Sequence, residues 1–245
     1  MLFSTISLFC VSLCEAKENI VARPWIKIKI EKEELSRICR EASVRCNDMG
    51  SSLWKVKNTH DQILYLLTDR LELVQLKKVG EKLAVLNHWK FKNYSHSITE
   101  YGDDEFNSGG MSVYPAFYPI SADIDAIALV SQWYAGYSGG GREESIADFV
   151  ALESNGKYQP AMSSIPFSLS ERIRACFSEK DYKTSPHCHD ESGSTLSIQF
   201  KDVGKPYYQW TLNYTDFTWD AGKTEKFKKV KKHSVVLMPF GRKIQ

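Results

Sequence analysis

The sequence predicts a mainly β fold, in which an antiparallel meander forms a sandwich- or propeller-like domain with one short N-terminal α-helix. The 245 residues include 12 Tyr, 12 Phe and 6 Trp, a composition that suits strands better than a helical bundle. Short apolar runs recur about every ten residues between turn-forming residues, which is the spacing of stacked or radially arranged sheets. The first four runs span residues 53–56, 63–67, 71–76 and 83–89.

The helix is predicted before this meander, after a first strand. Residues 24–31 alternate strictly, with isoleucines on one face and Trp25 and lysines on the other, and predict a half-buried strand. In residues 31–46, acidic side chains come first and apolar side chains recur at helical spacing. Asn47-Asp48-Met49-Gly50 follows as a stop signal.

The second half of the chain continues the strand pattern. Ser154-Asn155-Gly156-Lys157 predicts a hairpin turn, and residues 170–177 predict a short helical turn. Pro115 and Pro119 make the first of the later strands an edge strand or an irregular one. The later predicted strands are residues 113–120, 127–134, 195–200, 207–214 and 234–239.

The N-terminus predicts export. Residues 1–16 read as a signal peptide, with an apolar run followed by a cleavage position near Ala16. No Lys or Arg precedes the run, so a buried N-terminal strand is the alternative. The run is too short for a stable anchor, and no other segment is apolar enough to cross a bilayer. We therefore expect residues 17–245 to form a single periplasmic or secreted domain without stable membrane insertion.

Four cysteines remain after cleavage: Cys39, Cys46, Cys176 and Cys188. An even number in an exported chain predicts two disulfides with three possible pairings, of which local pairing is the simplest. On one continuous helix, Cys39 and Cys46 would lie about 10 Å apart along the axis, too far for a bridge. Local pairing therefore requires the helix to end near Ala42 and the chain to fold back.

The C-terminal segment is strongly basic. Residues 223–245 contain seven Lys, one Arg and one Glu, a net charge of +7. Such a run is compatible with nucleic acid or anionic lipid. A solvated edge strand or hairpin that lysines protect from further pairing is the favoured interpretation. We expect no nucleic-acid partner for an exported, disulfide-bonded chain.

A glycine-rich loop in residues 125–152 is the main candidate for chemistry. Gly136-Tyr137-Ser138-Gly139-Gly140 matches G-x-S-x-G, the strand–turn–helix nucleophile motif, and residues 142–152 would then be the helix. A serine hydrolase would combine Ser138 with Asp216 and His233. Against this reading, the preceding residues resemble a meander rather than alternating strands and helices, and no upstream oxyanion loop is recognisable. We favour a glycine-rich hairpin tip.

The sequence His187-Cys188-His189-Asp190-Glu191 resembles a set of zinc or copper ligands. On an extended strand, His187 and His189 share a side that Cys188 does not. Cys188 is also the natural disulfide partner of Cys176. The favoured interpretation is a disulfide-tethered surface loop, with His187 and His189 as weak metal candidates and no cofactor expected.

The predicted function is therefore non-enzymatic binding. We expect an exported protein that binds another extracytoplasmic protein, as an inhibitor or an immunity-type factor. Aromatic and charged side chains together are typical of protein–protein hot spots. Two alternatives remain open, the serine hydrolase and a carbohydrate or cell-wall binding module. The predicted contact residues are Trp133, Tyr134, Tyr137, Arg142, Glu143 and Glu144.

Overall fold

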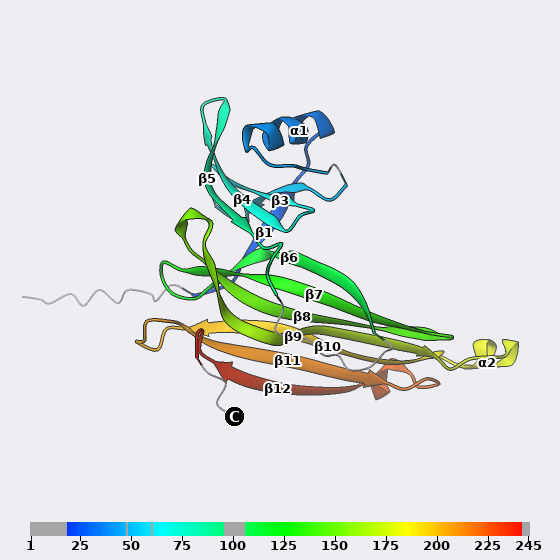
Figure 1. Ribbon diagram of the computed structural model, residues 1–245. Coiled ribbons are helices and arrows are strands. Elements are labelled where there is room, and N and C mark those ends of the chain that lie inside the picture. The colour runs from blue at the N-terminus through cyan, green and yellow to red at the C-terminus, as the bar shows by residue number, and fades with distance from the viewer. Residues whose placement is uncertain (1–18, 48, 60, 96–105, 242–245) are drawn as a thin grey trace, which may run out of the picture.

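The computed structural model of the chain describes residues 19–47, 49–59, 61–95 and 106–241. Within these residues, twelve strands form one antiparallel sheet in the order β12-β11-β10-β9-β8-β7-β6-β1-β2-β3-β4-β5. The predicted mainly β fold is confirmed, but the sheet is open rather than arranged as a sandwich or propeller (Figure 1). The spacing of strands along the sequence does not show whether a meander forms one continuous sheet or several separate sheets. The predicted signal peptide lies outside the described residues.

In the N-terminal part, short strands pack against one helix. Its elements are β1 (Arg23–Ile28), α1 (Lys32–Glu41), β2 (Ser52–Val56), β3 (Ile63–Thr68), β4 (Glu72–Val79) and β5 (Lys82–Lys90). Helix α1 packs Leu35, Ile38 and Cys39 against buried leucines and valines of the strands. The helix ends at Glu41 and the chain folds back, so that Cys39 and Cys46 form the predicted disulfide.

Strand β1 joins the N-terminal part to the long strands, because it pairs with β2 on one side and with β6 on the other. Its Trp25 stacks on Tyr65 at 5.1 Å between ring centroids and meets Phe117 edge-on at 4.8 Å. The face of β1 that carries Trp25 and the lysines is therefore covered at Trp25. Arg23 adds an ion pair to Asp125 at the start of β7.

The central strands are covered on both faces. They are β6 (Asn107–Pro119), β7 (Asp125–Tyr137), β8 (Gly140–Leu152) and β9 (Tyr158–Arg174). Ala128 and Phe149 lie in one core, whereas Ile127 and Val150 lie in another core that β2–β5 help to form. Two-sided burial explains why the apolar runs are continuous rather than alternating. The alternative helix at residues 142–152 is wrong, because these residues belong to β8.

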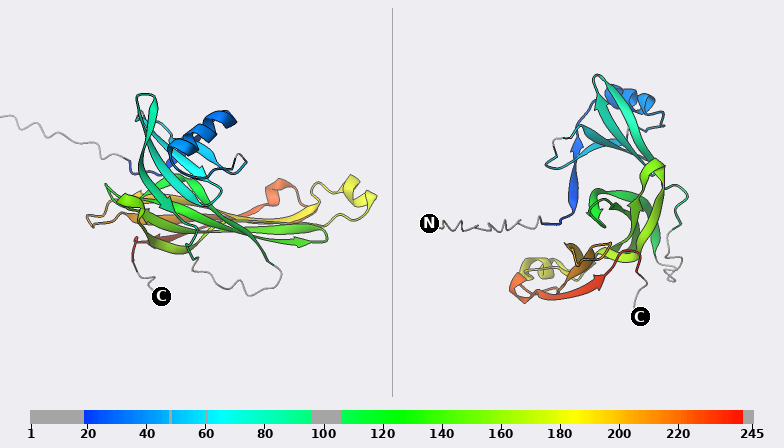
Figure 2. Two further views of the ribbon diagram at one scale, coloured as in Figure 1. Left: turned by 45° about the horizontal axis from the view of Figure 1, so that its top comes forward. Right: turned by 90° about the vertical axis from the view of Figure 1, so that its left-hand side faces the viewer.

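The last three strands leave more surface exposed. They are β10 (His189–Lys201), β11 (Gln209–Trp219) and β12 (Lys229–Leu237), and β12 forms one edge of the sheet. Trp210 of β11 is fully buried and donates its indole N–H to the Pro119 carbonyl at the end of β6 at 3.1 Å, so the sheet curves enough to bring β11 to β6. Figure 2 shows this curvature of the sheet. The basic segment thus contributes an exposed edge strand.

Two local predictions are corrected. Residues 170–174 continue strand β9 instead of forming a helical turn. The short helix α2 (Glu179–Thr184) lies just beyond, where Ser178 and Asp181 form a capping box. Pro115 does mark an irregularity, because the pairing of β6 with β7 shifts between Tyr114 and Tyr118.

Candidate functional site

The predicted contact residues lie on the β7–β8 hairpin, whose turn is Ser138-Gly139. Tyr134, Tyr137 and Glu143 are exposed, and Trp133 is half-buried. Arg142 pairs with Glu144 at 3.1 Å. Because Arg142 and Glu144 form an ion pair with each other, fewer of the predicted contact residues offer an unpaired charge to a partner.

The glycines of this hairpin permit close packing against β9. A Cβ atom at Gly140 would lie 1.8 Å from the Arg172 carbonyl oxygen, so any other residue would force the strands apart. Beside it, the Arg174 N–H donates to the Gly139 carbonyl at 2.7 Å. Strand packing thus explains Gly140 of the motif, whereas a Cβ atom at Gly136 would meet nothing within 4 Å.

The structure does not assemble the hydrolase triad. Ser138 sits between two antiparallel strands, whereas a nucleophile elbow needs a strand followed by a helix. His233 lies on β12, four strand positions from β8 in the order of the sheet. Of the three residues, only Asp216 and His233 meet, with His233 Nδ1 3.1 Å from Asp216 Oδ2.

A different serine completes that cluster, and sequence reasoning missed it. Ser194 of β10 donates its hydroxyl to Asp216 Oδ1 at 2.7 Å. The carboxylate therefore stands between the hydroxyl and the imidazole. In a catalytic triad the imidazole must be in the middle, where it removes the proton from the serine. This order makes the cluster a cross-strand hydrogen-bonded link between β10, β11 and β12.

Two residues of the predicted metal-binding sequence, Cys188 and His187, form a disulfide and a ring stack. Cys188 is bonded to Cys176, so it offers no thiolate. The His187 ring stacks on Trp219 with 3.6 Å between centroids and 2° between planes. Among the described residues, no group of three or more His, Cys, Asp or Glu side chains is placed to hold a metal ion.

Three connections gather at the end of the long strands that carries α2, and we call this region the loop end (Figure 1). It comprises the β7–β8 turn, residues 175–188 between β9 and β10, and residues 220–228 between β11 and β12. The Gly222 N–H donates to the His187 carbonyl at 2.7 Å, and the Ala221 N–H donates to Asp190 Oδ1 at 2.8 Å. With the disulfide and the His187–Trp219 stack, these bonds fix the last two connections together.

The loop end exposes aromatic rings beside positive charges. Phe177 is 71% exposed, Tyr182 54% and Phe227 55%. The Arg174 guanidinium lies 5.0 Å from the Phe177 ring centre, and Lys226 Nζ lies 5.1 Å from that of Phe227. Such rings on a cross-linked scaffold form a contact surface without a large ordering cost. The sequence signal for them was the presence of aromatics inside the disulfide loop and the basic segment.

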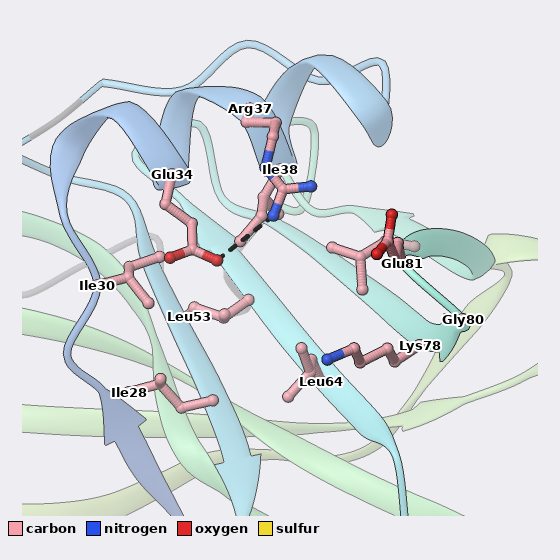
Figure 3. Close-up of a pocket in the computed structure, with 11 residues that line it drawn as sticks. Ile28, Ile30, Glu34, Arg37, Ile38, Leu53, Leu64, Lys78, Gly80 and Glu81 are labelled. Carbon is pink, nitrogen blue, oxygen red and sulfur yellow. Dashed lines mark hydrogen bonds and ion pairs between the residues drawn. The ribbon is translucent and has the colours of Figure 1, made fainter.

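A small pocket of about 360 Å³ lies between α1 and the strands beneath it. Figure 3 shows its apolar floor, which includes Leu53 and Leu64, and a charged rim. On that rim, Arg37 and Glu34 are joined at 3.4 Å. The pocket adjoins the helix–sheet core, and its carboxylates Glu34 and Glu81 belong to no group of three or more possible metal ligands among the described residues.

Comparisons with known proteins give no relative: no family model, no curated protein and no solved structure matches the chain. A search of the helices in the described residues finds none that is long and apolar enough to span a membrane. The case for function therefore rests on the geometry of the chain itself.

Proposed function

We propose that this chain is an exported, non-enzymatic binding protein, and that the loop end docks onto another extracytoplasmic protein. The role is of the inhibitor or immunity type, in which a binder covers a site on its partner instead of transforming a substrate. The observation that carries the proposal is the set of exposed rings, Phe177, Tyr182 and Phe227, on one cross-linked end of the sheet. The two disulfides are consistent with an oxidising compartment.

The charge on the β11–β12 side of the loop end indicates the chemistry of the partner, because residues 220–232 contain six Lys against one Asp and one Glu. Lys223 and Lys226 lie beside the Phe227 ring, and Lys228 Nζ lies 3.9 Å from the Phe217 ring centre. The neighbouring β12 adds further lysines. Complementary charge speeds association and suppresses wrong partners, so the favoured partner presents an acidic surface.

Site-specific photo-cross-linking tests the proposal. A benzoylphenylalanine at position 182 is expected to capture one protein from the extracytoplasmic fluid of the host. The same probe at the exposed position 199 of β10, in the strand half that leads away from α2, is the matched control and should capture nothing. Charge reversal by Lys226→Glu with Lys228→Glu is expected to reduce capture at least tenfold, because Coulomb attraction becomes repulsion.

Two results would count against this function. Equal capture from positions 182 and 199 would mean that the contact is unspecific. Capture that survives the charge reversal and the Phe177→Ala substitution would place the contact outside the loop end. Labelling of Ser138 by a fluorophosphonate would instead favour the hydrolase.

A further inference from the structure

A groove of about 960 Å³ lies between β9 and the strands β11 and β12. Met162 and Ile165 line it from β9, Leu212 from β11, and Val235 and Leu237 from β12. Val235 is 42% exposed, so the apolar wall reaches solvent. Pockets that hold drug-sized molecules typically measure about 300–1,000 Å³, which places this groove at the upper end of that range.

The backbone pairing creates the groove. Strands β9 and β10 pair only over residues 168–174 and 189–195, and the first part of β9 pairs with β8 alone. The segment after β12 then returns to β9, where the Phe240 N–H donates to the Ala161 carbonyl at 2.8 Å. The opening therefore belongs to the fold and does not depend on one side-chain rotamer.

The part of the groove lining that the structure describes offers no charged side chain to an ionic ligand. None of the lining residues within residues 106–241 is Lys, Arg, Asp or Glu. The imidazole of His233 already faces the Asp216 carboxylate, with 3.1 Å between Nδ1 and Oδ2. Burial raises the pKa of the Tyr214 phenol, which keeps that group neutral as well. An ion entering this space would lose its hydration without gaining a partner.

A few neutral polar groups accompany the apolar wall. Ser163, Ser164 and Ser194 line the groove with His233, whose ring stacks on that of Tyr214 at 4.9 Å. Ser194 and His233 both contact Asp216, so the polar groups on this side have fixed positions. A hydrophobic wall with a few fixed polar groups is the usual composition of a small-molecule site.

We propose that this groove binds an uncharged lipid-like molecule, one with a long apolar body and one or two hydroxyl or carbonyl groups. The site is separate from the loop end, and the proposal does not depend on the protein-binding function.

Binding of the neutral fluorophore N-phenyl-1-naphthylamine to the full chain tests this site. We expect saturable binding, and we expect displacement by uncharged monooleoylglycerol at concentrations at least tenfold lower than those of oleate or oleylamine. Val235→Arg should weaken binding of the fluorophore at least tenfold, because it places a charge in the apolar wall. Val230→Arg is the matched control: Val230 is an exposed valine of the same strand, 56% exposed against 42% for Val235, and it is not among the residues that line the groove. Its replacement should change binding less than twofold.

Three results would overturn the proposal. The first is an absence of saturable binding by the unmodified chain, and the second is equal binding by the Val235→Arg and Val230→Arg variants. The third is a groove covered by a second copy of the chain. In that case, fluorophore binding would fall as a dimer forms with increasing protein concentration, and Val235→Arg would yield a monomer in analytical ultracentrifugation.

Discussion

The central strands β7 and β8 and the outer strands β11 and β12 differ in how many of their faces are covered. The apolar residues 126–130 of β7 and 146, 147 and 149–151 of β8 are buried between two cores. Strand β12 is exposed over eight of its nine residues, and β11 is covered mainly on the face that carries Trp210, Leu212 and Tyr214. Both pairs are built from antiparallel strands of the same chain, so coverage rather than strand type distinguishes them.

This difference indicates that one region of the molecule provides most of its stability and another provides its open surface for binding. Burial of apolar surface on both faces of β7 and β8 contributes most to folding, since the hydrophobic contribution scales with the area removed from water. The outer strands retain the open surface that the loop end and the groove use. Substitutions in the two regions should therefore affect different measurements, and four predictions test this separation.

The largest effect is expected at Asp148 of β8, a carboxylate with 0% exposure. It accepts a hydrogen bond from the Tyr94 hydroxyl at 2.9 Å and one from the Ser164 N–H at 2.7 Å. Ser164 has a positive φ of 57°, in a β9 bulge opposite Asp148. Asp148→Ala leaves both donors without this acceptor and should lower the free energy of unfolding by about 3 kcal/mol, measured by denaturant titration.

Asp216→Ala is the matched control for Asp148→Ala. Asp216 also accepts a hydroxyl hydrogen bond and contacts a second side chain, but it lies on an outer strand at a partly exposed position. Its loss should cost less than about 1 kcal/mol, because solvent replaces the missing contacts. Equal losses for the two variants would contradict the proposed separation.

The next largest effect is expected from the loop-end disulfide. Replacement of both Cys176 and Cys188 by Ala should cost about 2 kcal/mol, below the chain-entropy value of about 3 kcal/mol, because the His187–Trp219 stack still holds the loop. Amide exchange should become faster in residues 175–188 while β7 and β8 keep their protection. Loss of protection in β8 would show that the two regions are coupled.

Turn residues decided much of what the sequence could predict. Short strands such as residues 53–56 were found as apolar runs between turn-forming residues. Residues 142–152 of β8 were not assigned as a strand, because apolar periodicity alone does not separate a buried strand from a helix. The disulfides were predictable from cysteine count and spacing. The groove and the loop end were not predictable from the sequence. The groove depends on where β9 and β10 stop pairing, and the loop end depends on which connections lie together in the fold.

A smaller effect is expected at the edge of the sheet. Lys231 and Lys232 lie on β12, which pairs with β11 on one side and with no other described strand on its outer side. Lysines on an edge strand oppose its pairing with another chain. The double substitution of Lys231 and Lys232 by Thr should increase self-association in sedimentation velocity while changing stability by less than about 0.5 kcal/mol. The same substitutions at Lys201 and Lys205, away from β12, should leave the sedimentation unchanged.

The smallest effect is a local pH dependence in α2. The Asp181 carboxylate accepts N–H hydrogen bonds from Phe177 and Ser178. Hydrogen bonding with the Ser178 side chain first, and then these two N–H bonds, lower the pKa of Asp181 below the ordinary value of 3.8. An acid with a lowered pKa stabilises the folded loop above its ordinary pKa, and this stabilisation is lost as the pH falls through the folded value. Amide exchange at Phe177 and Ser178, corrected for its intrinsic pH dependence, should therefore accelerate below about pH 4. Asp181→Asn should show fast exchange already at pH 6 and no further acceleration in acid, whereas a pH response retained in that variant would assign the effect to another group.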